Sequence, residues 1–370
     1  MFKTLSLNPY VILTFILLIV QPGFVSAQQL HDYSEEVQYP TFVLHGFGEL
    51  RNYSKTPSGE TNVHAGQQVA HIISTFSDRV TAFGEFSFTN VESDTDTDVE
   101  RLILRYDFSD KFKLSVGKYH TPIGYWNSSY HHGAWLQTTI DRPSIMKYGS
   151  QIVPIHFEGV LAEGTLPVAG INLAYRTGFG TGIHNNITVH GDHGDTDGDD
   201  AFVLQLYNRP AGIHGLEIGA SFYQDDVNLD EQVAHSIANI EEKIYSLHVA
   251  LERESAEIIA EYVYWDHEQT HSAKLNNNGY GYYIQAAHRF HGKYEQLKPY
   301  ARFDKIEADK DDVLFFKNQS FKGVTLGLRY DFADYAALKV EYRNEKTGND
   351  DNLDSLVVQV SFVWPHIIQI

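Results

Sequence analysis

Two patterns constrain this chain more than any single motif. Polar and apolar side chains alternate with period two in many segments, and short connections alternate with long ones between these segments. At the end of the chain, for example, Val324, Leu326 and Leu328 are separated by Thr325 and Gly327. That spacing places one set of side chains on each face of a β-sheet. The chain is therefore predicted to be built almost wholly from β-strands.

The connections indicate what kind of sheet these strands form. Tight turns occur near residues 77–79 and 109–111, whereas residues 120–154 and 178–200 form long stretches. Barrels of bacterial outer membranes have short periplasmic turns, longer external loops and an even number of strands. We therefore predict an all-β fold, a transmembrane antiparallel β-barrel of about 16 strands over residues 41–370, with a long third loop folded inward.

The predicted strands can be counted between the connections. A closed ring of strands leaves no unpaired backbone edge in lipid, which is what a membrane requires. Counting gives segments that start near Thr41, Val63, Arg79, Val99, Lys111, Ile155, Gly170, Ala201, Leu216, Glu241, Ala256, Tyr280, Pro299, Lys322, Tyr335 and Asp354.

Aromatic residues near the segment ends predict two interfacial girdles. Tyr106, Tyr330 and Phe332 precede short turns and are expected at the periplasmic side. The external girdle is expected from Tyr53, Tyr223, Tyr264 and Trp265. A soluble β-sandwich, in which aromatic residues pack a core, is the alternative reading of the same residues.

The first 40 residues predict export. Residues 11–20 read VILTFILLIV, follow Lys3, and precede a small-residue cleavage site at residues 25–27. An apolar core of this length is typical of a secretory signal and too short for a spanning helix. We predict a signal peptide at 1–27 and a short periplasmic tail at 28–40, and hence an outer-membrane location in a Gram-negative bacterium.

Composition excludes several functions. The chain has no Cys, which excludes iron–sulfur clusters and thiol catalysis, and its formal charge of −20 argues against binding nucleic acid. The expected surroundings are the lipid bilayer and lipopolysaccharide, which divalent cations could bridge to acidic loops. No GxSxG, P-loop or dinucleotide-binding motif occurs. We therefore expect no enzyme and no cofactor, although a barrel enzyme with a Ser–His pair on its outer wall stays open.

The aromatic stretch at residues 117–158 is the predicted constriction, because loops of this length inside compact proteins are usually functional. Its basic residues could attract anions or pair with Asp141 and Glu158, and its aromatic residues could guide solutes or anchor the loop. Lumen-facing basic and acidic residues are nearly balanced, so ion selectivity is not predicted. The candidate pore residues are Lys118, Tyr119, Tyr125, Trp126, Arg142 and Lys147 of this stretch, and Arg101, Arg105, Arg176 and Arg329 of the wall.

Metal binding is the other chemistry considered for residues of the loops. The chain has 19 His, and several of them lie around residues 120–156 and 184–193. The acidic run HGDHGDTDGDD could hold a cation through Asp192, Asp195, Asp197 and Asp199, but it lacks the last Glu of an EF-hand loop. We therefore expect no metal site, and keep these four residues as the candidates.

Residues 114–125, LSVGKYHTPIGY, resemble the phosphate-selective porin O/P family and its wider group of sixteen-stranded porins. The matching step is a Gly-Lys-aromatic strand end followed by a Pro-Ile-Gly turn, and residues 45–54 resemble that group's first strand. The resemblance implies a homotrimeric passive channel for small solutes or ions. The lysine clusters and arginine ladder of the phosphate-selective proteins have no clear counterpart. A plugged receptor barrel, with or without a bound metal, is the alternative function.

Overall fold

The computed structural model of the protein describes residues 39–56, 61–91, 94–130, 133–147, 152–168, 170–182, 200–228, 239–269, 276–312, 314–315, 319–348 and 352–369. The predicted signal peptide, residues 28–38 of the predicted tail, and the acidic candidates Asp192, Asp195, Asp197 and Asp199 lie outside these ranges. Those expectations therefore remain predictions.

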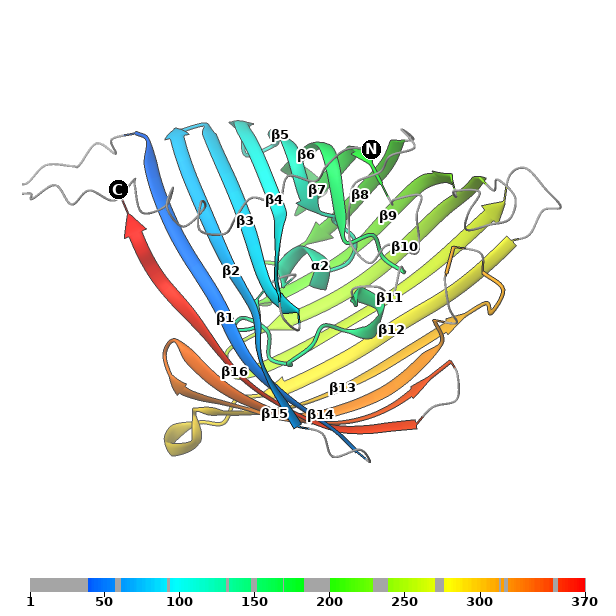
Figure 1. The fold of residues 1–370 in the computed structure, drawn as a ribbon. Helices are drawn as coiled ribbons and strands as arrows, with labels where there is room; N and C mark the ends of the chain where they lie inside the picture. Colours follow the sequence, from blue (N-terminus) through cyan, green and yellow to red (C-terminus); the bar gives the residue numbers. More distant parts are fainter. Residues whose placement is uncertain are drawn as a thin grey trace, which may run out of the picture. The chain divides into compact units, whose positions relative to one another are not determined.

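Within the described residues, sixteen strands form a closed antiparallel barrel in which each strand pairs with its neighbours in sequence and β1 pairs with β16 (Figure 1). This confirms the predicted fold class. The strands are β1 Thr41–Thr56, β2 Thr61–Ser77, β3 Val80–Val91, β4 Asp94–Ser109, β5 Phe112–His120, β6 His156–Val168, β7 Ile171–Thr181, β8 Asp200–Asn208, β9 Leu216–Asn228, β10 Asn239–Glu252, β11 Ala256–Gln269, β12 Asn276–His288, β13 Leu297–Ala308, β14 Phe321–Ala333, β15 Ala336–Thr347 and β16 Asn352–Gln369.

The predicted strand starts lie close to the observed ones. The larger differences occur where a strand begins with polar residues. β4 begins at Asp94 rather than near Val99, and β12 begins at Asn276 rather than near Tyr280. Both added segments are polar, DTDTD and NNNG. A period-two apolar pattern marks only the part of a strand that has an apolar face, while the backbone ladder continues beyond it.

The barrel wall is apolar outside and largely polar inside, as the alternation predicts. In β10, Leu247 is 60% exposed and its neighbours Ser246 and His248 are 2% exposed. Large exposed apolar side chains of this kind occur on strands all round the barrel. An exposed apolar exterior around a polar interior is the arrangement that a transmembrane barrel presents to lipid. The outer face is therefore the lipid-facing surface.

The external aromatic girdle was predicted wrongly in part. Tyr223 and Trp265 are fully buried and belong to the core inside the barrel, whereas Tyr264 lies on the other face of β11 from Trp265. Position near a strand end does not determine which face a residue occupies, because the period-two parity does. The side chain of Tyr53 lies outside the described part. At the other end, Tyr106, Tyr330 and Phe332 are exposed as expected.

The last strand continues past the segment that the sequence pattern marks. β15 pairs with β16 only as far as Ala336 opposite Phe362, but β1 continues the pairing to Val43 opposite Gln369. The C-terminal residues therefore extend β16 along β1.

Among the described residues, helices are limited to α2 Trp126–Ser129, η1 Ser144–Met146 and η2 Gly292–Tyr294, and none is long and apolar enough to cross a membrane.

Replacing Leu247 by Lys should destabilise the barrel, because it puts a charge on the lipid-facing surface near the middle of β10. The expected loss is about 2–4 kcal/mol for a site near the bilayer centre. Guanidinium unfolding in lipid vesicles measures it. Thr81→Lys is the matched control, since Thr81 is paired with the lumen-facing Arg105 and its change should cost far less. Equal losses in both variants would contradict the assignment of the two faces.

Candidate functional site: the loop inside the barrel

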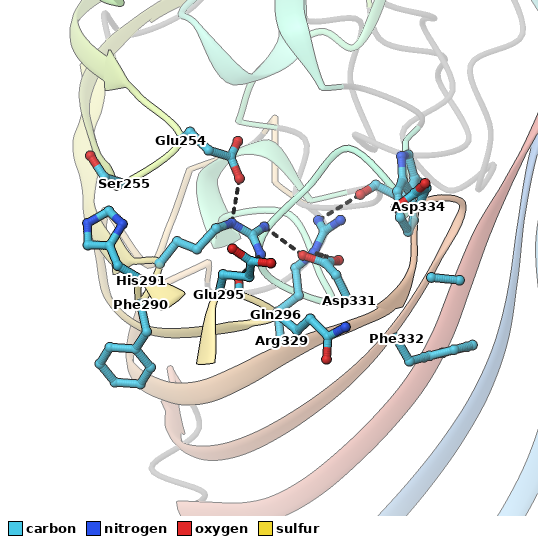
Figure 2. Close-up of a pocket in the computed structure, with 13 residues that line it drawn as sticks. Glu254, Ser255, Phe290, His291, Glu295, Gln296, Arg329, Asp331, Phe332 and Asp334 are labelled. Carbon is cyan, nitrogen blue, oxygen red and sulfur yellow. Dashed lines mark hydrogen bonds and ion pairs between the residues drawn. The ribbon is translucent and has the colours of Figure 1, made fainter. Parts of the chain in front are cut away.

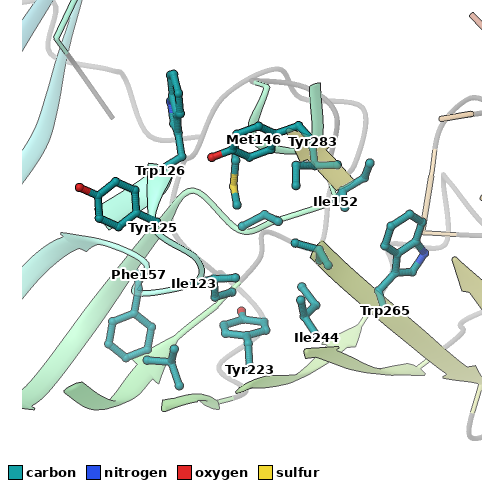
Figure 3. Packing of buried hydrophobic residues seen from close by; sticks show 14 of the residues in the cluster. Ile123, Tyr125, Trp126, Met146, Ile152, Phe157, Tyr223, Ile244, Trp265 and Tyr283 are labelled. Carbon is teal, nitrogen blue, oxygen red and sulfur yellow. The ribbon is translucent and has the colours of Figure 1, made fainter. Parts of the chain in front are cut away.

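The connection between β5 and β6 spans residues 121–155, and its described residues, 121–130, 133–147 and 152–155, fold into the barrel and pack against its inner wall. Its side chains Ile123, Trp126 and Ile145 are buried in one cluster with wall residues such as Tyr223 and Trp265. Figure 3 shows loop side chains and wall side chains facing one another in this cluster. The predicted inward loop is therefore present, and the ends of the predicted 117–158 stretch belong to β5 and β6.

Gly124 forms the tight turn at which the loop enters the barrel. Its backbone N–H donates to Ser221 Oγ at 3.2 Å, and its carbonyl accepts from Gln205 Nε2 at 2.8 Å. Its φ of +70° favours glycine, and a Cβ there would collide with the carboxylate of Glu261. The Pro-Ile-Gly step that the sequence analysis singled out is thus the point where strands β8 and β9 hold the loop.

Glu261 of β11 is the main polar anchor of this first segment. Its carboxylate accepts the backbone N–H groups of Tyr125 and Trp126 at 2.7 and 2.8 Å, and the hydroxyl of Tyr283 at 2.5 Å. Glu261 is only 2% exposed. Charge-assisted hydrogen bonds of this kind are shorter and stronger than neutral ones. One wall carboxylate therefore satisfies the first N–H groups of α2 and orders the turn.

Aromatic packing reinforces that anchor. The Trp126 ring meets the Tyr283 ring edge to face, with centroids 6.0 Å apart, and Trp126 is almost wholly buried. The Tyr125 hydroxyl donates to Glu252, which belongs to β10. Tyr119 is buried against Phe157 at the loop's stems. The predicted aromatic candidates Tyr119, Tyr125 and Trp126 therefore anchor the loop, one of the two roles considered for them.

Lys339 of β15 holds the middle of the loop by its carbonyl groups. Its side chain is fully buried, and Nζ donates to the carbonyl oxygens of Ala134, Gln137 and Thr139 at 2.5, 2.7 and 3.1 Å. A buried ammonium group needs such partners, since leaving it unpaired in a low dielectric is costly. Three convergent carbonyl oxygens supply them, so this loop segment and the lysine depend on each other.

Arg329 of β14 holds the same segment from the side. Its Nη1 donates to the carbonyl oxygens of Trp135 and Gln137 at 2.7 and 3.0 Å, and its guanidinium lies 4.8 Å from the centre of the Trp135 ring. A guanidinium over an indole face is a favourable cation–π contact. Arg329 was predicted as a pore residue, but its side chain is buried under the loop and acts as an anchor.

Strands β13 and β15 hold the next part of the loop. The backbone N–H of Ser144 donates to Asp304 at 2.9 Å, and that of Ile140 donates to Glu341 at 2.6 Å. Arg302 donates to the carbonyl oxygen of Asp141 at 2.7 Å and to the carboxylate of Asp304 at 2.8 Å. Wall side chains thus provide both donors and acceptors for loop backbone that forms no regular structure.

Asp141 connects the loop to β1 and β15 through ion pairs. Its carboxylate accepts from Arg51 of β1 at 2.6 Å and from Arg343 of β15 at 2.5 Å. Burial alone would raise the pKa of Asp141, but the two guanidinium groups outweigh it and hold that pKa well below the ordinary value. The carboxylate therefore stays ionised, and the loop is attached to the wall from β8 round to β1.

Three predicted wall residues lie in the arc that the loop does not cover. Arg101, Arg105 and Arg176 are half-buried, with side chains between 25% and 37% exposed. Each is paired with carboxylates on the same arc: Glu85 for Arg101, Asp107 for Arg105, and Glu163 for both Arg105 and Arg176. The guanidinium groups are thus accessible from the lumen while their charges are largely balanced.

The remaining predicted residues have different positions. Arg142 is half-buried and donates to the carbonyl oxygen of Met146 at 3.3 Å, and Lys147 is exposed. Lys118 was expected in the lumen, which is wrong. It is directly opposite Leu102, which is 57% exposed on the outer face, and it pairs with Glu158 at 3.9 Å. Tyr119 faces the interior, so parity turns its neighbour Lys118 outward.

A hollow of about 750 Å³ lies at the short-turn end of the barrel (Figure 2). Arg289 and Arg329 both bind Asp331 there, at 2.6 and 2.7 Å. Trp135 of the loop lines the same hollow as the turn residue Glu254. The loop is therefore reachable from the short-turn side.

The comparisons with known proteins agree with this geometry. A scan against protein-family models finds no match, and a search of curated proteins finds none either. Solved structures do match. OmpT, an outer membrane protein of Vibrio cholerae, has a TM-score of 0.61 at 13% identity, over 89% of this chain and 99% of that one. Another of its structures is a trimer form.

Two further solved structures have the same architecture. The anion-selective porin from Comamonas acidovorans has a TM-score of 0.61 at 10% identity, over 88% of this chain and all of that one. The outer membrane channel DcaP of Acinetobacter baumannii has a TM-score of 0.59 at 10% identity, over 88% and 96%. The described part of the chain is thus a transmembrane β-barrel with the fold of the sixteen-stranded outer-membrane porins. The narrower resemblance to the phosphate-selective family stays a prediction.

Glu261→Gln should loosen the entry turn of the loop, because an amide has one acceptor oxygen where the carboxylate has two. Losing a charge-assisted bond costs about 1.5–3 kcal/mol. We expect faster amide hydrogen exchange in residues 121–130, measured by mass spectrometry. Glu158→Gln is the matched control, since Glu158 lies on the outer face. Unchanged exchange in Glu261→Gln would contradict its role as an anchor.

The Asp141 bridge should resist acid. A lowered pKa means that the bridge contributes fully above the carboxylate's ordinary value of about 3.9, and is lost only as pH falls through the lower folded value. Once the intrinsic pH dependence of amide exchange is corrected for, protection in residues 133–147 should therefore be the same at pH 7 and pH 5 in the native chain. Asp141→Asn should lower this protection at both pH values. A native chain that loosens between pH 7 and 5 would show that Asp141 does not hold this segment.

Proposed function

We propose that the protein is an outer-membrane porin that lets small hydrophilic solutes or ions diffuse passively, with residues 121–155 as its constriction. The observation that carries this proposal is the one-sided attachment of the loop. Anchors from β8 round to β1 fix it against one part of the wall. Half-exposed charged side chains remain on the arc from β4 to β7. A polar, incompletely filled lumen is what a diffusion channel requires.

The same proposal covers location and assembly. We place the chain in the outer membrane of a Gram-negative bacterium, exported by the signal at residues 1–27, among lipid and lipopolysaccharide. The apolar outer surface and the likeness in fold to outer-membrane proteins support this location. A homotrimer is proposed from the trimer form of Vibrio cholerae OmpT.

A plugged receptor barrel is the second candidate, and one observation favours it. Loop and wall side chains between β5 and β13 form a continuous buried cluster, so much of the lumen is filled by packed protein. We further propose that the chain is not an enzyme. A barrel enzyme would need a Ser and a His placed together on the outer wall, and the sequence offers no spacing that requires this.

Single-channel recording in a planar bilayer decides between channel and plug. Refolded protein should give steady open steps, and the reversal potential in a salt gradient should then give the preferred ion. A barrel that is shown to be folded by circular dichroism, yet conducts nothing, would refute the porin proposal and favour the receptor.

Shortening the loop tests the constriction separately. Replacing residues 125–147 by a short Gly-Ser linker removes the segment that Glu261, Lys339 and Asp304 hold. The open-channel conductance should rise at least about twofold, because the cross-section available to ions grows. Shortening the short-turn side at residues 292–294 is the control and should leave the steps unchanged. Steps of native size after loop removal would show that the narrowest point lies elsewhere.

A further inference from the structure

A cavity of about 320 Å³ separates the loop from strands β1 to β3. It lies on the side where the loop is not packed into the hydrophobic cluster. Its volume is within the range of small-molecule sites. The residues that line it include Phe47, Glu49, Arg51 and Gln67 of the wall, and Asp141 and Arg142 of the loop.

The charges around this cavity cancel. Among the described residues that line it, Glu49 and Asp141 are acidic, and Arg51 and Arg142 are basic. Arg51 binds both acids, Asp141 at 2.6 Å and Glu49 at 3.2 Å. The side chains of Arg51 and Asp141 are still 27% and 29% exposed, so they keep surface for a solute. The cavity thus offers many hydrogen-bonding groups with no net charge.

Aromatic rings continue from the cavity along the wall. Phe47 of β1 meets His71 of β2 edge to face at 5.2 Å, and His71 meets Phe83 of β3 in the same way at 5.2 Å. The guanidinium of Arg101 lies 4.6 Å from the centre of the Phe83 ring. These groups are half-buried, so ring surface stays open to the lumen. Polar groups and apolar ring surface therefore lie side by side.

This combination selects a particular solute chemistry. A bare ion would gain little, because Arg51, Glu49 and Asp141 already pair with one another on the cavity wall. An apolar solute would leave the buried charges and amides without the water they bond to. A pyranose ring suits both parts, since its C–H face packs on an aromatic ring while its hydroxyls bond carboxylates, guanidinium groups and amides.

On the basis of the proposed channel function, we propose that this cavity is a binding subsite for neutral saccharides in transit. Phe47 serves as the ring platform, and Arg51, Gln67 and Asp141 serve as partners for the hydroxyl groups. The His71 and Phe83 rings extend the surface along which the sugar moves. A subsite of this kind raises the local solute concentration at the constriction without requiring tight binding.

Sugar-induced block of the ion current tests the proposal. Maltose, sucrose and glucose are added in turn to open channels in 1 M KCl. The salt carries the ion current and screens long-range charge effects. We expect at least one of the three to reduce the current in a saturable manner. Glycine, a zwitterion of smaller size, should leave the current unchanged. Saturable block by glycine and none by any sugar would overturn the proposal in favour of a zwitterion site.

Variants assign the block to the cavity. Phe47→Ala should raise the half-blocking sugar concentration by about tenfold, because the ring contact is lost. Phe47→Tyr should preserve the block. Phe42→Ala is the matched control, since Phe42 belongs to the same strand but is exposed on the outer face. Equal weakening in Phe42→Ala and Phe47→Ala, or none in either, would show that the sugar binds elsewhere.

Calorimetry on the folded protein in detergent separates this proposal from the channel proposal. Open steps with neither sugar block nor heat of sugar binding would refute the subsite and leave the porin intact. Sugar binding that Phe47→Ala abolishes, in a barrel that does not conduct, would refute the porin and support the subsite within a receptor.

Discussion

The central constraint on this molecule is that an irregular loop inside a barrel must still satisfy its backbone hydrogen bonds. The described residues of the loop at 121–155 contain little helix, so their backbone N–H and C=O groups form hydrogen bonds with wall side chains. Glu261 accepts two N–H groups, and Lys339 donates to three carbonyl oxygens. These bonds, rather than contacts between side chains alone, give the loop one position. The charged interior of the wall is therefore a structural device that holds the loop.

The architecture of the barrel could be predicted because it follows from local rules. Period two assigns each residue to a face, and turn residues mark where a strand reverses. The errors came from positions where one rule was set aside. Lys118 was chosen for its charge and for its place in a motif, although the buried Tyr119 beside it already determines an outward orientation. Tyr223 and Trp265 were placed by their distance from a strand end and not by parity.

The internal arrangement of the loop could not be predicted in the same way. Alternation predicts charged side chains on the lumen face of the wall, where Glu261, Lys339 and Glu341 lie. Their partners, however, depend on contacts between residues far apart in sequence. Trp126 and Glu261 are 135 residues apart, and Lys339 and Ala134 are 205 residues apart. No local pattern carries such a pairing. The Pro-Ile-Gly motif was the local signal for the loop's entry. Its Gly124 adopts the positive φ of the entry turn.

The position of the loop's anchors along the chain bears on how the barrel is assembled. The loop lies in the first half of the sequence, but Lys339, Glu341 and Arg343 all belong to β15, the last strand but one. Until β15 is in place, the carbonyl oxygens of residues 134–139 have no ammonium group to converge on. The position of the loop is therefore complete only when β15 has joined the ring of strands, and a chain inserted only as far as β14 would hold its central loop by the contacts from β8 to β14 alone.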